Sequence, residues 1–308
     1  VIEAVVSLDE SSGSIGFGVN ILLPDKKTAL ERSHLGLIVN GKNLSTQFTF
    51  TSKSDVVSMT ETYSLSSGKQ LTVEDTYHQC NFVFNSVDGY ELNLLFKVFD
   101  EGVAYQYGID SLDTKSLCHI YSDQATFKLP DQGRMWAQPY DNISRWTPAY
   151  EAYYADGVPI GTRAPADKNG WAFPLLFQTG DVWTLITEAA VYNGNCAMHL
   201  QPECEHGIYK MRLPEEEEAY HVCSAITEVN LPWSSPWRVV MTGTSLNTIF
   251  QSNMVTSLCP DNILEHTEWI KPGRSSWSWW SASGSPKDYY ALKEFVDLSS
   301  DMGWEYSL

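Results

Sequence analysis

The sequence predicts a mainly β protein, in which a large antiparallel β-sandwich is followed by the start of an α/β domain. Three observations carry this prediction. Short alternating segments at roughly ten-residue spacing fill residues 1 to about 130, with turn signals and no helical periodicity between them. Further β-type runs fill much of residues 171–243. The last forty residues then follow the order strand, loop, helix, strand, which is typical of a parallel α/β array.

The bulk composition limits the function classes. A chain of 308 residues is long enough for one large domain or two ordinary ones. Its net charge of −18 argues against a nucleic-acid-binding surface, which needs a basic patch. The acidity indicates either solubility alone or carboxylates that hold a hard cation such as Ca²⁺. The 11 Trp and 16 Tyr indicate sheet cores or sugar-binding faces, because flat rings cover the C–H face of a sugar.

The cysteines and the hydropathy exclude two further classes. The six cysteines include no C-x-x-C pair and no Cys/His cluster with zinc spacing, and buried free thiols explain them as well as disulfides do. No run of 18 apolar residues predicts a membrane span, and no signal peptide opens the sequence. Both a cytosolic protein and a chain whose leader has been removed stay open.

The first 130 residues are expected to form hairpins and a central strand. Residues 2–8 and 15–23 predict a first hairpin around the turn at 11–14. The nearly continuous apolar run at 91–99 predicts a central strand. The other expected strands are residues 35–39, 47–50, 56–65, 70–76, 80–87, 103–109 and 125–129.

Residues 131–170 are less regular, and they are rich in proline and aromatic residues. This composition predicts a long loop region that is ordered rather than disordered. Such a loop either lies over a binding site or domain interface, or packs against the outside of the sandwich.

Strands are expected to resume at residues 171–177 and 182–190, and Glu188 ends the second of them beside two alanines. A carboxylate at the end of a buried strand needs a partner, because burying it unpaired is costly. From the sequence alone, a salt bridge, a simple turn position and a functional carboxylate all stay open.

Four segments complete the first domain. The glutamate run at 215–218 predicts a solvated loop, with a weak cation site as the alternative. Strands are expected at 220–227 and 236–243, and residues 246–258 predict either a short helix or a strand. Residues 260–268 form a polar connector, so we expect one domain over 1–268 and a second over 269–308.

The second domain begins with a tryptophan-rich stretch at 269–280, in which residues 275–280 predict a strand. A helix is expected next, with Ser285 as its N-cap, Pro286 as its first residue and Gly303 just past its end. A new strand opens at residue 304. An eight-fold barrel needs about 250 residues, so we expect most of this domain to lie beyond Leu308.

Ordered motifs along the whole chain resemble glycoside hydrolase family 97. The first βα unit of that family's barrel is similar to the segments Trp269-Ile-Lys-Pro-Gly-Arg274, Trp277-Ser-Trp-Trp280 and Gly303-Trp-Glu-Tyr306. Upstream matches follow in the same order, at Asp100-Glu-Gly-Val-Ala-Tyr-Gln-Tyr107, Phe127-Lys-Leu-Pro130, Pro174-Leu175, Leu185-Ile-Thr-Glu-Ala189 and Pro236-Trp-Arg238.

The resemblance implies a bacterial α-glucosidase or α-galactosidase that is Ca²⁺-dependent and exo-acting on oligosaccharides. It implies an N-terminal β-supersandwich, a catalytic (β/α)8 barrel and a C-terminal β domain, in a periplasmic or secreted protein. One calcium-ligating glutamate of the family comes from the N-terminal domain, and Glu188 matches that position. The acid and the base or nucleophile are expected beyond Leu308, so this chain alone is expected to be inactive.

The tryptophans of the predicted first barrel strand are candidate substrate-binding residues. Alternation would place Trp277 and Trp279 on one face and Trp280 on the other, either toward substrate or in barrel packing. Two other hypotheses stay open for the chain, a non-catalytic carbohydrate-binding sandwich and a purely structural domain. The sugar released, the inverting or retaining mechanism and the oligomeric state are not predicted.

Overall fold

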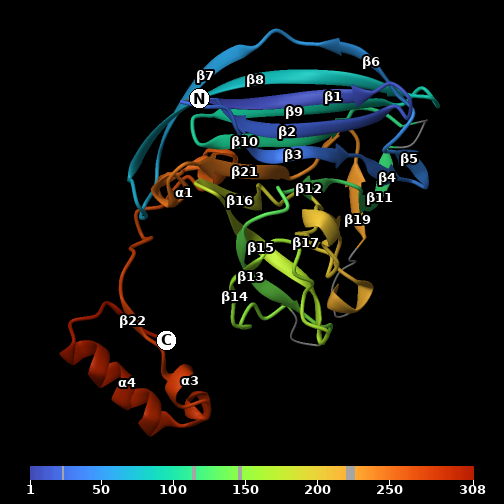
Figure 1. Cartoon of the computed structure of the whole chain (residues 1–308). Helices are drawn as coiled ribbons and strands as arrows, with labels where there is room; N and C mark the ends of the chain where they lie inside the picture. Colours follow the sequence, from blue (N-terminus) through green and yellow to red (C-terminus); the bar gives the residue numbers. More distant parts are fainter. Residues whose placement is uncertain (23, 113–115, 145–147, 220–225) are drawn as a thin grey trace. The chain divides into compact units, whose positions relative to one another are not determined.

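Antiparallel strands dominate the computed structural model, which describes residues 1–308 apart from 23, 113–115, 145–147 and 220–225 (Figure 1). Within these residues, seventeen strands form one connected sheet network, and a four-stranded sheet and a two-stranded sheet accompany it. The first ten strands are β1 (Ile2–Asp9), β2 (Ser14–Ile21), β3 (Lys27–Leu35), β4 (Leu37–Val39), β5 (Lys42–Leu44), β6 (Phe48–Lys53), β7 (Val57–Ser64), β8 (Thr72–Ser86), β9 (Glu91–Phe99) and β10 (Gly102–Ile109).

The strands that follow carry the chain to residue 243. They are β11 (Leu117–Asp123), β12 (Thr126–Lys128), β13 (Arg134–Asp141), β14 (Ala155–Pro159), β15 (Lys168–Thr179), β16 (Val182–Ala189), β17 (His199–Leu200), β18 (Ile208–Arg212), β19 (Thr227–Asn230), β20 (Trp233–Ser234) and β21 (Trp237–Gly243). Two 3-10 turns, η1 (Glu205–Gly207) and η2 (Glu216–Ala219), lie among them, and the helices α1 (Leu246–Gln251) and α2 (Met254–Ser257) follow.

Two layers of strands enclose the main core, so the predicted sandwich is confirmed. One layer runs β8–β9–β10–β21–β16–β15–β13 through antiparallel pairs. The other contains β1, β2, β3, β12 and β18. Phe17 of β2 reaches across to Tyr105 of β10, with 4.9 Å between ring centroids. Side chains from two inner faces interdigitate in this way in packed sheets.

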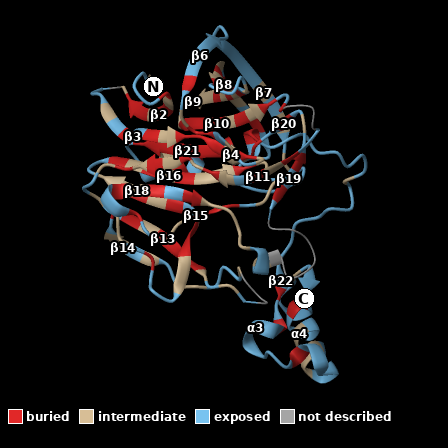
Figure 2. Cartoon of the chain, turned by 90° about the vertical axis from the view of Figure 1, so that its right-hand side faces the viewer, coloured by how far each residue is buried: buried red, intermediate tan, exposed pale blue. Residues whose placement is uncertain are grey.

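Burial along the strands follows the two-residue period of a sheet. On β2, Ile15, Phe17, Val19 and Ile21 are buried and point to the core. On β9, the predicted central strand, Leu92, Leu94 and Phe96 do the same, and pairs with β8 and β10 flank it on both edges. Figure 2 shows the buried residues gathered on β2, β3, β10, β16 and β21.

A second, smaller core covers the outer face of β16 and β21. Ile249 of α1 and Met254 of α2 pack there against Trp237 and Met241. Because both of its faces are covered, every residue of β21 is buried. Residues 246–258, for which both a short helix and a strand were open, form two short helices.

Several predicted boundaries are wrong, for identifiable reasons. Residues 131–170 are not one long loop, because β13, β14 and the start of β15 lie within them; bulges between β13 and β15 break the alternation there. The charged segment of β3 was not predicted as a strand. The runs predicted at 70–76 and 80–87 are one strand, β8. Most of the strand predicted at 220–227 lies outside the described residues.

Cys118 and Cys204 are buried, and Cys223 lies outside the described residues. No helix among the described residues is both long and apolar enough to cross a membrane.

The chain divides into two compact units: Val1–Glu61 with Glu74–Pro260, and Thr62–Val73 with Asp261–Leu308. The second unit contains β22 (Ser275–Ser276), α3 (Ser278–Ser281), the 3-10 turn η3 (Ser285–Lys287), α4 (Tyr289–Asp301) and β23 (Tyr306–Ser307). β22 and β23 pair in parallel, so the predicted order of strand, helix and strand is confirmed. Its continuation into a barrel stays a prediction.

Both ends of α4 follow helix-capping chemistry, although the start differs from the prediction. Asp288, and not Ser285, is the N-cap, because its carboxylate accepts hydrogen bonds from the amides of Tyr290 (2.9 Å) and Ala291 (3.2 Å). At the other end Gly303 has a φ of 64°, and the Trp304 amide donates to the Ser299 carbonyl at 2.8 Å. That bond and the left-handed glycine form a Schellman motif, and Gly303 lies just past the helix end as the sequence predicts.

Candidate functional site around Glu188

Glu188 lies at the end of β16, directly opposite Arg238 of β21 in the strand register. The Glu188 side chain is 8 % exposed, and the Arg238 side chain is 3 % exposed. One oxygen of Glu188 accepts a hydrogen bond from Arg238 Nη1 at 2.9 Å, and the other accepts one from the Met198 amide at 2.8 Å. The partner that a buried carboxylate requires is therefore a salt bridge.

Arg238 is shared between two carboxylates. Asp123, at the end of β11, accepts hydrogen bonds from Nη2 at 2.8 Å and from Nε at 3.1 Å through the same oxygen. Its other oxygen accepts one from the Ala125 amide at 2.8 Å. With all three groups ionised, this buried triad carries a net charge of −1. It therefore favours an additional cation over an additional anion.

The pKa shifts follow from this arrangement. Burial raises the pKa of Glu188, while Arg238 and the Met198 amide oppose the rise. Burial alone would lower the pKa of Arg238, but Asp123 and Glu188 outweigh it and raise that pKa. The guanidinium is therefore charged at any working pH, and it holds the Glu188 carboxylate in one orientation.

A second group of polar side chains follows directly after Met198 in the chain. His199 of β17 is fully buried and stacks on Tyr140 of β13, with 3.8 Å between ring centroids and 4° between planes. The Tyr140 hydroxyl donates to Glu218 at 2.9 Å. Burial raises the pKa of Glu218, and the hydrogen bond from Tyr140 opposes this. The solvated loop predicted at 215–218 is thus wrong for Glu218, which is half-buried in η2.

Tyr150 lies beside both carboxylates. Burial and the negative charges of Glu188 and Glu218 raise the pKa of its hydroxyl. Its backbone is in the left-handed region with a φ of 55°, a conformation that costs energy in a residue other than glycine. Gln138 of β13 holds this turn by donating to the carbonyls of Tyr150 (2.8 Å) and Ala152 (2.9 Å). Strained residues that their surroundings fix in this way concentrate at functional sites.

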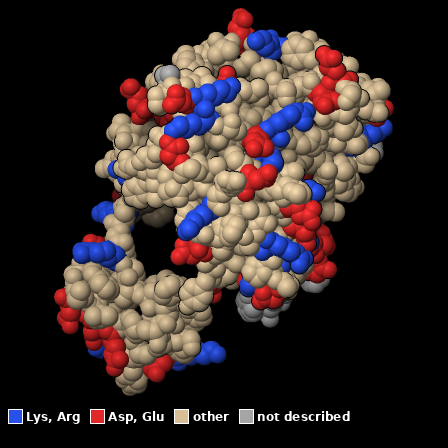
Figure 3. Space-filling view, in the orientation of Figure 1, with Lys and Arg blue, Asp and Glu red and all other residues tan. Residues whose placement is uncertain are grey.

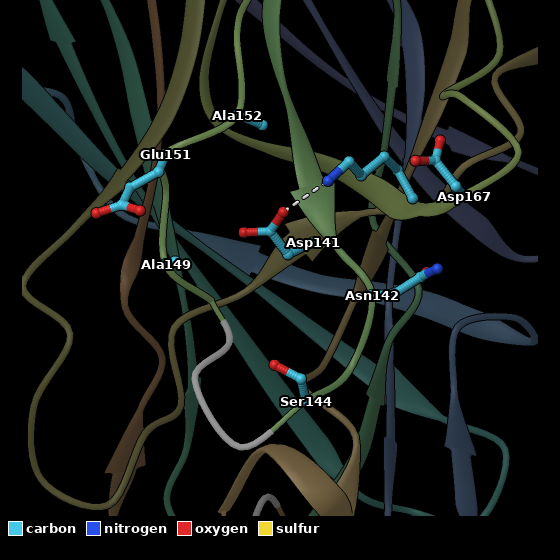
Figure 4. Close-up of a pocket in the computed structure, with 8 residues that line it drawn as sticks. Asp141, Asn142, Ser144, Ala149, Glu151, Ala152 and Asp167 are labelled. Carbon is cyan, nitrogen blue, oxygen red and sulfur yellow. Dashed lines mark hydrogen bonds and ion pairs between the residues drawn. The ribbon is translucent and has the colours of Figure 1, made fainter.

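The segment around Tyr150 also borders an acidic pocket of about 430 Å³. Figure 4 shows Asp141, Glu151 and Asp167 around it, and Lys168 Nζ pairs with Asp141 at 2.8 Å. Three carboxylates against one ammonium favour a cationic or hydroxylated ligand over an anion. On the face drawn in Figure 3, acidic and basic side chains are interspersed.

The described residues do not form a calcium site by themselves. Ca²⁺ takes six to eight oxygen ligands, and no cluster of three or more His, Cys, Asp or Glu in the described part of the chain is arranged to hold a metal. Glu188 can offer a second lone pair on each oxygen.

The three candidate tryptophans lie together in the second unit, but not on a strand. β22 ends at Ser276, Trp277 precedes α3, and Trp279 and Trp280 are within that helix. The prediction that Trp280 faces away from the other two is wrong: the Trp277 ring stacks on Trp279 at 6.0 Å and on Trp280 at 5.3 Å. All three are exposed, by 44 %, 44 % and 75 % respectively.

Asp123, His199 and Arg238 were not predicted as site residues. Glu218 belongs to the run for which a weak cation site was the alternative, and Tyr140 and Tyr150 belong to the region that was expected either over a binding site or domain interface or against the sandwich. One signal was available, since Arg238 interrupts an apolar strand and a buried guanidinium needs acidic partners. The others become visible only when β11, β13, β16 and β21 are assembled.

Replacing His199 with phenylalanine is expected to remove a pH-dependent loss of stability. Burial, and secondly the charge of Arg212, lower the pKa of His199 from 6.5 to about 3. The unfolded chain therefore binds more protons below pH 6.5, and the wild type loses stability as pH falls toward 3. Between pH 7 and pH 5 the wild type should lose about 2 kcal/mol of unfolding free energy through this histidine. Urea unfolding of His199→Phe should not show that loss. The exposed His266→Phe is the control, and a parallel loss in His199→Phe and the wild type would contradict the prediction.

The chain is similar to known proteins in both sequence and fold. The model of the glycosyl-hydrolase 97 N-terminal family matches residues 3–260. The chain is 27 % identical to a probable retaining α-galactosidase from Streptomyces bingchenggensis (strain BCW-1), over 99 % of its own length and 44 % of that protein. It is 28 % identical over 103 residues to a retaining α-galactosidase from Bacteroides thetaiotaomicron, 30 % of this chain and 14 % of that protein.

Two solved structures share the fold. A β-arabinopyranosidase superposes with a TM-score of 0.89 at 24 % identity, over 99 % of this chain and 48 % of that one. A glycoside hydrolase family 97 enzyme from Pseudoalteromonas sp. strain K8, in complex with acarbose, superposes with a TM-score of 0.80 at 20 % identity, over 99 % and 45 %. The chain thus spans less than half the length of these relatives.

Proposed function

Because the chain belongs to glycoside hydrolase family 97 and matches the N-terminal domain of that family, we propose that it is the N-terminal part of a Ca²⁺-dependent, exo-acting α-glycosidase. The observation that supports this most is the family match over residues 3–260. Both curated relatives are named α-galactosidases, which favours terminal α-galactosides over α-glucosides as substrates. We also propose that the protein acts outside the cytoplasm, either in the periplasm or after secretion from the cell.

Glu188 is proposed to contribute one ligand to the Ca²⁺ ion. Its buried position keeps water from competing for the carboxylate, and Arg238 and the Met198 amide fix its orientation. When bound, Ca²⁺ supplies a positive charge that orients sugar hydroxyls and favours an ionised carboxylate beside it. A raised pKa at Glu188 lets protons compete with the cation, so ion binding should weaken as pH falls.

The catalytic pair is proposed to lie beyond Leu308. Glycoside hydrolysis requires two carboxyl groups that flank the scissile bond, one of them protonated. Glu188 is held in a salt bridge and is assigned neither role. Under this proposal the 308-residue chain positions a metal ligand for chemistry that other residues perform. The Trp277–Trp279–Trp280 stack stays a proposed substrate contact.

The activity is tested on the longer protein, containing this chain and the residues that follow it in its gene. We expect hydrolysis of p-nitrophenyl α-galactoside, or of the α-glucoside, that falls on removal of calcium by EDTA and returns on its addition. The 308-residue chain alone should give only the background rate. Failure of the longer protein on both substrates would contradict the proposal and favour a non-catalytic carbohydrate-binding domain. Calcium-dependent turnover by the 308-residue chain would contradict the placement of the catalytic pair.

A further inference from the structure

We propose that the cavity between the loop after β16 and the segment that carries β20 binds a neutral saccharide. This cavity has a volume of about 470 Å³, within the range of about 300–1,000 Å³ that is usual for small-molecule sites. It does not include Glu188, and its assignment does not depend on the proposed hydrolase activity.

The walls of the cavity are joined by one amide side chain. Asn195 donates from Nδ2 to the carbonyls of Tyr192 (2.9 Å) and Ser234 (3.3 Å), and its Oδ1 accepts a hydrogen bond from Trp233 Nε1 at 3.0 Å. Ser235 extends this wall into the core, where its hydroxyl accepts a hydrogen bond from the Tyr107 amide at 3.0 Å. These bonds hold the two segments in place before any ligand arrives. A preformed site loses less entropy when a ligand binds.

The charge of the lining indicates the class of ligand. No Asp, Glu, Lys or Arg lines the cavity among the described residues, although the chain carries a net charge of −18. A charged ligand would lack a counter-ion there and would be desolvated at a cost. The polar groups that line it are amides and hydroxyls, which can both donate and accept. A polyhydroxylated neutral molecule matches this lining.

Three side chains are placed to contact such a ligand. Asn193 and Asn230 are exposed, and within the described residues neither side chain takes part in a hydrogen bond. Each therefore has two donor hydrogens and an acceptor oxygen available for sugar hydroxyls. Tyr192 leaves 46 % of its surface exposed beside them. Its ring can cover the C–H face of a pyranose, which is the usual aromatic contact to a sugar.

The test uses this chain and ligand-observed NMR with methyl α-galactoside, methyl α-glucoside and maltose. We expect millimolar binding of at least one of them. Tyr192→Ala and Asn230→Ala should weaken that binding by about tenfold, which corresponds to the loss of about 1.4 kcal/mol. Tyr153→Ala and Asn247→Ala remove an exposed tyrosine and an exposed asparagine outside the cavity lining, and should bind as the wild type does.

Three results would overturn the assignment. The first is no binding of any of the sugars by the wild type at tens of millimolar. The second is unchanged binding by both cavity variants while their thermal unfolding matches the wild type. The third is binding that EDTA abolishes, because an uncharged cavity holds no metal and that result would place the sugar at a cation site. The two proposals can fail separately. If the longer protein fails the hydrolase assay but sugar binding persists in EDTA, the failed assay contradicts the proposed function and the binding supports this inference.

Discussion

Arg238→Met is expected to destabilise the first unit by about 3–5 kcal/mol at pH 7, the usual cost of removing one partner from a buried ion pair. Asp123 and Glu188 would both stay in the protein interior, where their partners among the described residues are Arg238 and backbone amides. Methionine keeps most of the aliphatic volume of arginine. The loss of unfolding free energy therefore results from the missing positive charge and not from a cavity. Urea unfolding followed by circular dichroism measures it.

The pH dependence of that variant separates charge from packing. Burial raises the pKa of Glu188 and Arg238 opposes that rise, so without the guanidinium the pKa of Glu188 in the folded state should lie further above its unfolded value. Such a group stabilises the fold below the unfolded pKa and loses this contribution as pH rises through the folded pKa. The deficit of Arg238→Met should therefore shrink when unfolding is measured near pH 4. Arg238→Lys keeps the charge without the two-pronged geometry and should lose less. A deficit below about 1 kcal/mol at pH 7 would contradict the burial argument.

Much of the sandwich could be predicted because alternation is a local signal. The first hairpin follows from apolar residues at every second position, which bury one face of a strand, and the central strand β9 follows from a nearly continuous apolar run. β3 was missed because its exposed positions carry Thr28, Glu31 and Arg32, and its buried residues do not alternate with them one by one. β13 and β14 were missed because each bulge in the pairing of β13 shifts the alternation by one residue.

The site was predictable only in part, because its contacts span long distances in the chain. The sequence indicates that Glu188 needs a partner, since a carboxylate cannot be buried alone. It does not indicate which one, because Arg238 lies 50 residues away and reaches Glu188 only through the β16–β21 register. The bond from Arg238 to Asp123 spans 115 residues. No periodicity encodes either distance.

The tryptophan stretch shows how two kinds of local structure compete. Its β-type composition predicts a strand through Trp280, yet the strand ends at Ser276. Ser278 then opens a helical turn, in which the Ala282 amide donates to its carbonyl at 2.9 Å. Small residues on either side of the tryptophans allow this turn, and the three indole rings stack outside it. Strand propensity depends on neighbouring strands, and the flanking pair here is only two residues long.

Glu188→Gln is expected to weaken Ca²⁺ binding by at least about tenfold in the longer protein, and to lower its α-glycosidase rate accordingly. The substitution removes one negative charge from the proposed ion and keeps the size of the side chain. It also removes an acceptor from either Arg238 or the Met198 amide, so a fold control is needed. Asp123→Asn is that control, because it takes a carboxylate from the same guanidinium without touching Glu188.

Calorimetric titration of Ca²⁺ into the metal-free longer protein at pH 7 tests this assignment most directly. We expect Glu188→Gln to bind Ca²⁺ at least about tenfold more weakly than the wild type, and Asp123→Asn, which removes the same charge from the triad but no proposed ligand, to lose far less. Equal affinities in all three proteins, or equal losses in the two variants, would contradict the role of Glu188 as a calcium ligand.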